Sequence, residues 1–312
     1  RNGAQYALPK YHGALADYYN KDLFDKHKVA YPAAGWTHSD YQTVMTAFAR
    51  QRSAGSETAV WGSMFDVSWD RIQAHVNAWG GHFVDPNDPT KSMMGRPESI
   101  DAMQWLRDRM WSDHAMASRL DVQNLNVTEA FYRGRLAMVE DGSWSLKSIL
   151  DNAPFRVGVE TFPAGPAGQV TMGTTDGFGI YKGTRYPEAA WEFMKFLISP
   201  RYGRAMARAH LLQPARASLV QEWIALASEQ YPEKAQDMNL AAFAEGHING
   251  KSVTPEIFAN QDEARRLTTA AWEQIFTLGR ARVATMAEVS NQIEAAQAGK
   301  AETRREEAQR AA

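Results

Sequence analysis

The chain has 312 residues, of which 44% are apolar and 22% charged, and its formal net charge is −2. This balance is ordinary for a globular protein and gives no electrostatic reason to expect nucleic acid as a partner. No apolar run approaches the roughly 20 residues that span a bilayer, and the chain has no cysteine, which excludes disulfides, thiol catalysis and cysteine zinc sites.

The first part of the chain alternates between strand-like and helical patterns of apolar residues. Strands are expected near Tyr18-Tyr19-Asn20 and over 57–65, 135–139, 155–160 and 177–183. Helices are expected over 36–55, 68–81, 96–111 and 126–135. Strands that alternate with helices indicate α/β layers rather than a helix bundle.

After residue 185 the pattern becomes almost wholly helical. Helices are expected over 186–200, 200–210, 217–230, 234–246, 260–279 and 284–297. In the first of them, Ala190, Phe193, Met194 and Leu197 share one face. The charged tail, 298–312, is expected to be a frayed or extended helix.

The sequence carries little catalytic machinery. Its histidines lack metal-binding spacing, and neither a nucleophile elbow nor a phosphate-binding loop is present. Glu140 and Asp141 are adjacent, so on an extended backbone they point to opposite faces. That arrangement is a poor start for a hydrolase with paired carboxylates. We therefore expect no catalytic residues, no metal ligands and no cofactor.

The stretch GRLAMVEDGSWSLKSIL, residues 134–150, places a tryptophan at a strand-to-helix turn, where solvent is near. An indole offers a flat apolar surface that can cover the C–H-rich face of a sugar. We expect Trp144 to stack on a ligand, with Gly142 and Ser143 allowing the backbone to approach it closely. Most other tryptophans lie in amphipathic helical patterns and are expected to pack in the core.

Five stretches follow one another in a characteristic order. They are YALPKYHGALADYYNKDLFDKHKVAYPAAGWTHSDY, NAWGGHFVDPNDP, FYRGRLAMVEDGSWSL, GVETFPAGPAGQVTMGTTDGFGIYKGTRYPEAAWEFMKFLISP and LLQPARASL. Their order and spacing resemble the family 1 extracytoplasmic solute-binding proteins of ABC importers, which include maltose- and glycerol-phosphate-binding proteins. The resemblance covers about residues 5–297.

The resemblance implies a two-lobe α/β fold of the periplasmic-binding-protein type (type II), with the ligand in the cleft between the lobes. It also implies an incomplete N-terminal lobe, because the family's Tyr-x-x-Pro segment lies well inside that lobe but begins here at Tyr6. The N-terminal lobe would hold 1–13 and 177–217, the C-terminal lobe 14–170 and 233–297, and the inter-lobe crossovers 171–176 and 218–232.

The candidate ligand-binding residues come from several of these stretches. They are Trp61, Asp66, Trp69, Trp144, Gly173, Thr174, Thr175, Asp176, Arg216 and Phe258. Aromatic rings would stack on the ligand, the crossover residues would donate and accept hydrogen bonds, and Arg216 could bind a hydroxyl, carboxylate or phosphate in a fork. Packing is the alternative for Trp69, and capping of a helix or turn is the alternative for Arg216 and Asp176.

The function implied by the resemblance is non-catalytic. The protein would close around its ligand by hinge bending and deliver it to the membrane permease subunits of an ABC-type importer. A sugar or oligosaccharide is the expected ligand, in a periplasmic or extracytoplasmic location, with a lipid anchor on a missing N-terminus as one option. The alternatives are a phosphodiester, an opine or a polyamine on the same fold, or a sugar-active hydrolase.

Overall fold

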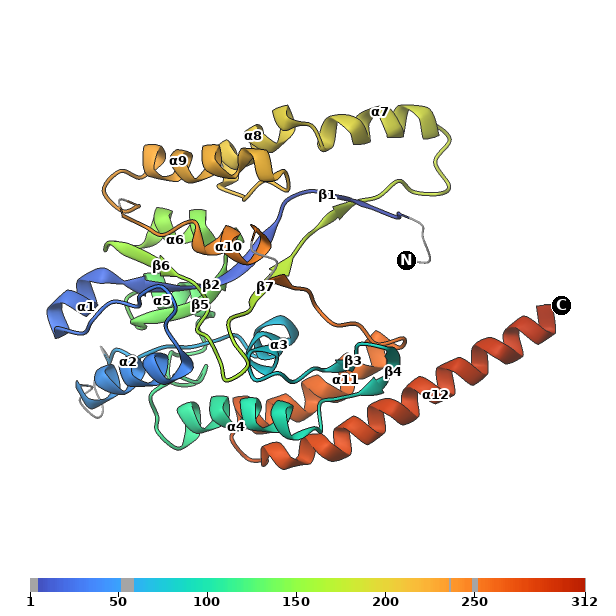
Figure 1. Cartoon of the computed structure of the whole chain (residues 1–312), viewed down its shortest axis with the longest axis horizontal. Coiled ribbons are helices and arrows are strands. Elements are labelled where there is room, and N and C mark those ends of the chain that lie inside the picture. The colour runs from blue at the N-terminus through green and yellow to red at the C-terminus, as the bar shows by residue number, and fades with distance from the viewer. Residues whose placement is uncertain (1–4, 52–58, 236, 249–251, 312) are drawn as a thin grey trace.

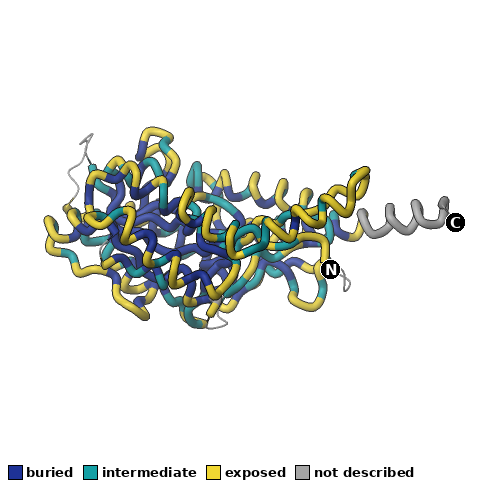
Figure 2. Tube along the Cα trace, turned by 90° about the horizontal axis from the view of Figure 1, so that it is seen from above, coloured by how far each residue is buried: buried dark blue, intermediate teal, exposed yellow. Residues whose placement is uncertain are grey.

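The computed structural model describes residues 5–51, 59–235, 237–248 and 252–311, without the side chains of His247 and residues 300–311. A mixed β-sheet lies between two groups of helices, which is the α/β layering that the sequence predicts (Figure 1). Buried residues concentrate at the end of the molecule away from its two termini (Figure 2).

Strand β2 (Gly13–Asn20) is the centre of the sheet, and every one of its residues is buried. It pairs antiparallel with β5 (Met138–Gly142) at one edge, and with β6 (Val157–Glu160) and β7 (Thr171–Thr174) at the other. Strand β9 (Ser252–Val253) extends the sheet parallel to β7. Burial on both faces explains why β2 reads as a nearly continuous apolar run.

Alternate residues of β2 contribute to two hydrophobic clusters, one on each face of the sheet. Tyr18 faces the first cluster, which contains α5 (Val127–Tyr132), α6 (Leu146–Asn152), α9 (Val220–Gln230) and α10 (Ala242–Ile248). Tyr19 faces the second cluster, which contains α1 (Lys21–His27), α2 (His38–Gln51), α3 (Trp69–Ala78), α4 (Pro97–Trp111), α11 (Gln261–Trp272) and the first part of α12 (Met286–Ala311). The hairpin β3 (Val84–Asp85)/β4 (Asp88–Ser92) lies against α12.

A separate segment lies beside the first cluster (Figure 1). It consists of an antiparallel ribbon of β1 (Leu8–Pro9) and β8 (Gly177–Phe178), followed by α7 (Pro187–Leu197) and α8 (Pro200–His210). Trp223 of α9 anchors this segment, because its buried indole donates a hydrogen bond to the carbonyl of Leu211 (2.8 Å) and lies next to Phe243.

Helix α7 differs from the expected amphipathic packing. Met194 is its one buried residue, whereas Phe193 is 61% exposed and Trp191 is 46% exposed. The apolar face that the sequence predicts therefore exists, but the described residues cover little of it.

Two predicted strands differ from what the structure shows. Within the described residues 59–65, Trp61 and Ser63 form only single bridges, so the strand predicted over 57–65 is wrong for that part; residues 57 and 58 lie outside the described residues. The strand predicted over 177–183 ends at Phe178, because its partner β1 has only two residues.

The helical predictions are largely confirmed, with one late start and one extension. The helix expected over 234–246 begins at Ala242, because Asp237 adopts a left-handed backbone (φ 59°) that is incompatible with a helix. The helix expected over 284–297 continues through the charged tail to Ala311. Residues 52–55 of the helix predicted over 36–55 lie outside the described residues. In the part of the chain that the structure describes, no helix is long and apolar enough to cross a bilayer.

Candidate functional site

Trp144 lies at the turn that the sequence predicts, between the end of β5 and the start of α6. Its ring packs against two glycines at the ends of adjacent strands. A Cβ atom on Gly142 would lie 2.3 Å from the ring, and one on Gly13 would lie 2.8 Å from it. We expected Gly142 to make room for a ligand; instead, this glycine makes room for the indole.

A cavity of about 530 Å³ lies beside the indole. Its lining comes from the segment before β2, from α6 and from the end of α8, and comprises Lys10, Trp144, Lys147, Ser148, Asp151, Asn152, Met206, His210 and Leu212. The volume lies in the range of small-molecule sites. Trp144 is only partly buried, so it borders an open groove and is not sealed inside the core.

Two of the lining residues, Lys147 and Asp151, bind each other and the hydroxyl of Tyr231. The ammonium of Lys147 donates to the carboxylate of Asp151 (2.9 Å) and to the hydroxyl of Tyr231 (3.1 Å), and that hydroxyl donates to Asp151. Burial alone would raise the pKa of Asp151, but the hydrogen bonds from Tyr231 and Lys147 outweigh it and lower this pKa. The hydrogen bond to Asp151 raises the pKa of Lys147. Lys147 and Asp151 therefore form an ion pair at neutral pH.

The crossover candidates lie close to the cavity without lining it. Gly173 is buried in β7, and Thr174 is half-buried. Thr175 is exposed and donates to the backbone carbonyl of Tyr11 (2.5 Å). The exposed carboxylate of Asp176 lies 4.0 Å from the ammonium of Lys10, which does line the cavity.

Three aromatic candidates lie in the hydrophobic core. Phe258 is 2% exposed, Trp69 5% and Trp61 7%. The indole N–H of Trp69 donates to a backbone carbonyl (3.1 Å), and its ring lies 6.2 Å from that of Phe258. For Trp69, this placement agrees with the packing alternative.

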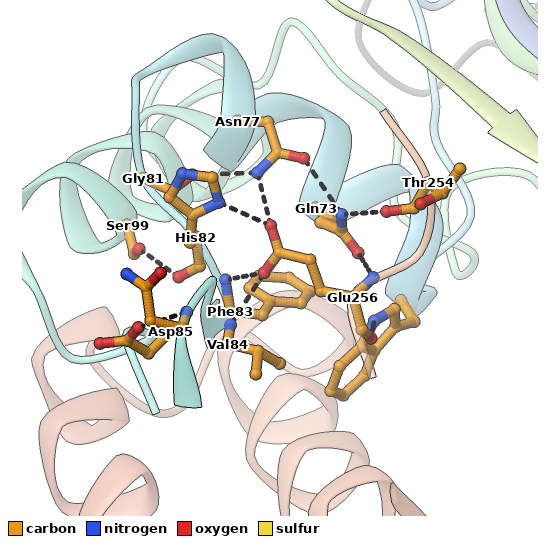
Figure 3. Close-up of polar contacts among 12 residues, drawn as sticks. Gln73, Asn77, Gly81, His82, Phe83, Val84, Asp85, Ser99, Thr254 and Glu256 are labelled. Carbon is orange, nitrogen blue, oxygen red and sulfur yellow. Dashed lines mark hydrogen bonds and ion pairs between the residues drawn. The ribbon is translucent and has the colours of Figure 1, made fainter. Parts of the chain in front are cut away.

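The segment around Phe258 is held by side chains of α3 and the turn after it (Figure 3). The carboxylate of Glu256 accepts hydrogen bonds from the side chains of Asn77 (3.0 Å) and His82 (2.8 Å) and from two backbone N–H groups of the β3 region. Gln73 accepts from the backbone N–H of Glu256 and donates to the carbonyl of Thr254. This network fixes the loop after β9 in the body of the protein, away from the cavity.

The two remaining candidates are exposed. Asp66 lies in the loop before α3. Arg216 donates from its Nε atom to the carbonyl of Ile198 (2.8 Å) at the end of α7, which is the capping role considered from the sequence. Of the sequence candidates, Trp144 is the one that lines the 530 Å³ cavity.

Sequence reasoning missed most of the residues that surround Trp144. Lys147 and Asp151 are four apart on the helix that follows it, so their pairing was within reach of a spacing argument. Lys10 and His210 come from distant parts of the chain, and only the fold brings them to the cavity.

Comparison with known proteins identifies the family of the chain. A family model described as bacterial extracellular solute-binding protein matches residues 1–239. The chain belongs to this family. The chain is 27% identical to a binding protein of Brucella abortus (strain 2308) over 205 residues, which are 63% of this chain and 47% of that relative. The match thus spans about half the relative's length.

Solved structures share the fold at low identity. The ABC substrate-binding protein Lmo0181 from Listeria monocytogenes, in complex with cycloalternan, has a TM-score of 0.81 at 21% identity, over 96% of this chain and 72% of that one. UgpB from Mycobacterium tuberculosis, in complex with glycerophosphocholine, has a TM-score of 0.74 at 20% identity, over 96% and 72%. These likenesses confirm the predicted two-lobe α/β fold. The lobe boundaries given above stay predictions.

Proposed function

We propose that this solute-binding protein binds a carbohydrate in the cavity beside Trp144. The observation that carries the proposal is a partly exposed indole on the wall of a cavity of about 530 Å³, with hydroxyl, amide and imidazole groups around it. An aromatic surface covers the apolar face of a sugar ring, and polar groups receive its hydroxyls. Solved structures with this fold include complexes with cycloalternan, acarbose and maltose.

The cavity is bounded by both predicted lobes. Lys10 and His210 belong to the segments that the sequence assigns to the N-terminal lobe, whereas Trp144 and Lys147 belong to the segment that it assigns to the C-terminal lobe. A ligand that contacts both lobes only in the closed form favours that form by its differential affinity. Closure would then present the loaded protein to the permease subunits of an ABC importer outside the cytoplasmic membrane.

A cationic ligand is less well matched to this cavity. A polyamine is recognised by carboxylates among aromatic walls, but the carboxylate that lines the cavity, Asp151, is held by Lys147 and Tyr231. A glycoside hydrolase would need a second carboxylate roughly 5–10 Å from the first across the cleft. The described lining contains Asp151 alone.

Calorimetric titration with a panel of maltooligosaccharides, other neutral glycans, glycerophosphodiesters, opines and spermidine tests the proposal. We expect stoichiometric heat with a glycan that is recovered unchanged. Trp144→Ala should weaken that binding by about 1–3 kcal/mol, because it removes the stacking surface. Trp191→Ala is the matched control, since Trp191 is a partly exposed tryptophan on α7, away from this cavity. Unchanged affinity in Trp144→Ala, or cleavage of the glycan, would overturn the proposal.

A further inference from the structure

A buried arginine lies beside the indole that borders the cavity. Arg71 is 9% exposed, and its guanidinium carbon lies 5.6 Å from the centre of the Trp144 ring. This distance is within the range of a cation–π contact. The same guanidinium donates to the carboxylates of Asp70 (3.0 Å) and Asp141 (2.8 Å).

The dipole of its own helix does not explain the position of Arg71. It lies in the first turn of α3, where the helix dipole favours negative charge and a cation is unfavourable. One of its partners, Asp70, lies in the same helical turn, whereas the other, Asp141, belongs to the strand that leads to Trp144. Asp141 also accepts from the hydroxyl of Thr128 (2.6 Å) and from the backbone N–H of Gly142 (2.8 Å).

The contacts around the indole therefore form a closed arrangement. Gly13 and Gly142 provide the surface on which the ring packs. The carboxylate of Asp141 accepts from the backbone N–H of Gly142, two residues before Trp144. Arg71 contacts both the ring and the carboxylate, because its guanidinium donates to Asp141 and lies over the ring of Trp144. A lysine would keep the charge but could not bind two carboxylates and cover the ring with one planar group.

We propose that Arg71 is a positioning residue for Trp144, which holds the indole in one rotamer with its remaining surface toward the cavity. The relevance of this role to ligand binding rests on the proposed function. When a partly exposed side chain becomes ordered only on binding, the entropy that it loses lowers the affinity for the ligand. A side chain that is already fixed before binding avoids this cost. The competing explanation is that Arg71 only neutralises Asp141 and that the indole would keep its position without it.

Fluorine NMR of protein labelled with 5-fluorotryptophan separates these explanations, and Trp144→Phe assigns the Trp144 line. The test variant is Arg71→Met/Asp141→Asn, which removes the cation together with the carboxylate that it neutralises. Gly142→Ala supplies a reference for a displaced indole, because the added Cβ would lie 2.3 Å from the ring. We expect the Trp144 line of the double variant to move toward that reference or to broaden, and the lines of the other tryptophans to stay in place.

The chain offers a matched control on α4. Arg109 is 8% exposed, pairs with Asp113 (2.6 Å) and lies 5.1 Å from the ring of Trp105. Arg109→Met/Asp113→Asn should move the Trp105 line and leave the Trp144 line unchanged. The Arg71 double variant should also bind the glycan found in the panel about 2- to 12-fold more weakly, whereas the Arg109 variant should bind it as the unmodified protein does.

The outcomes distinguish the two proposals. A Trp144 line that keeps its position in the folded double variant would overturn the positioning role, whatever the glycan affinity is. A displaced Trp144 line with unchanged glycan affinity would support the positioning role and contradict the proposed function. If the double variant does not fold, Arg71→Lys decides: a folded variant with an unshifted Trp144 line overturns the role, and a shifted line supports it.

Discussion

Asp141 and Glu140 are consecutive buried carboxylates of β5 whose hydrogen-bond partners differ. Asp141 faces a cation and two further donors: Arg71, the hydroxyl of Thr128 and the N–H of Gly142. Glu140 is fully buried on the other face, where its oxygens accept from the imidazole of His75 (3.0 Å) and the hydroxyl of Tyr41 (3.1 Å).

Three acidic residues meet on the Glu140 face, because strand pairing brings Asp17 and Glu160 together with Glu140. Asp17 of β2 is paired in register with Glu140 on one side and with Glu160 on the other, and it is fully buried. Burial, followed by the negative charge of Glu140, raises the pKa of Asp17 well above its ordinary value. Burial and the neighbouring His75 lower the pKa of His38, so that imidazole is neutral.

The two faces of β5 therefore differ in how their buried carboxyl groups are stabilised. Beside the cavity, the carboxylate of Asp141 pairs with an arginine that also lies over the ring of Trp144. Inside the sheet, burial and neighbouring acids raise the pKa of Asp17 instead. The first face should therefore respond to loss of a charge, and the second should respond to pH.

The largest expected effect is on the Asp141 face. Arg71→Met should lower the free energy of unfolding by about 3–5 kcal/mol, because it leaves the carboxylate of Asp141 buried without its cation. Adding Asp141→Asn should recover a large part of that loss. Urea denaturation at pH 7 measures both variants. A loss below about 1 kcal/mol, or no recovery in the double variant, would show that Asp141 does not depend on Arg71.

The next effect is on the opposite face and depends on pH. Because the pKa of Asp17 is raised on folding, the native state keeps a proton that the unfolded state releases above about pH 4. The stability from this group is complete below the unfolded pKa and is lost as pH rises toward the folded pKa, at about 1.4 kcal/mol per pH unit. Between pH 5 and 7 the free energy of unfolding should therefore fall with rising pH more in the unmodified protein than in Asp17→Asn.

Urea denaturation across this pH range makes the comparison, with Asp176→Asn as the control because that carboxylate is exposed at the crossover. The control should follow the pH dependence of the unmodified protein. Parallel curves for Asp17→Asn and the unmodified protein would mean that Asp17 is ionised in the native state.

The same strand shows what the sequence could and could not predict. Strand alternation predicts that Glu140 and Asp141 point to opposite faces, and the structure confirms it. The apposition of Asp17 with two acids depends on the register of strands more than 120 residues apart, which no local pattern contains. Trp144 was identifiable because a strand, a turn and a helix meet within a few residues.

The other aromatic candidates show the limit of local patterns. Trp61 and Phe258 follow or precede short extended stretches, as residues that line a cleft often do. Whether such a ring faces a cleft or the core depends on which distant helix covers it, and here α5 and α11 belong to the clusters that do so. The exposed side of α7 is the reverse case, since its amphipathic pattern is present without a described surface that covers it.

The smallest expected effect separates stabilisation from positioning on the Asp141 face. Thr128→Val removes one of the three donors to Asp141, while Arg71 and the N–H of Gly142 remain. The free energy of unfolding should therefore fall by only about 1 kcal/mol, the net value of a single hydrogen bond. Thr43→Val, which removes an exposed hydroxyl on α2, should lower the free energy of unfolding by less. Because Arg71 still covers the indole, glycan affinity in Thr128→Val should equal that of the unmodified protein. A loss of affinity as large as that in Arg71→Met/Asp141→Asn would mean that the carboxylate, and not the arginine, determines where the indole lies.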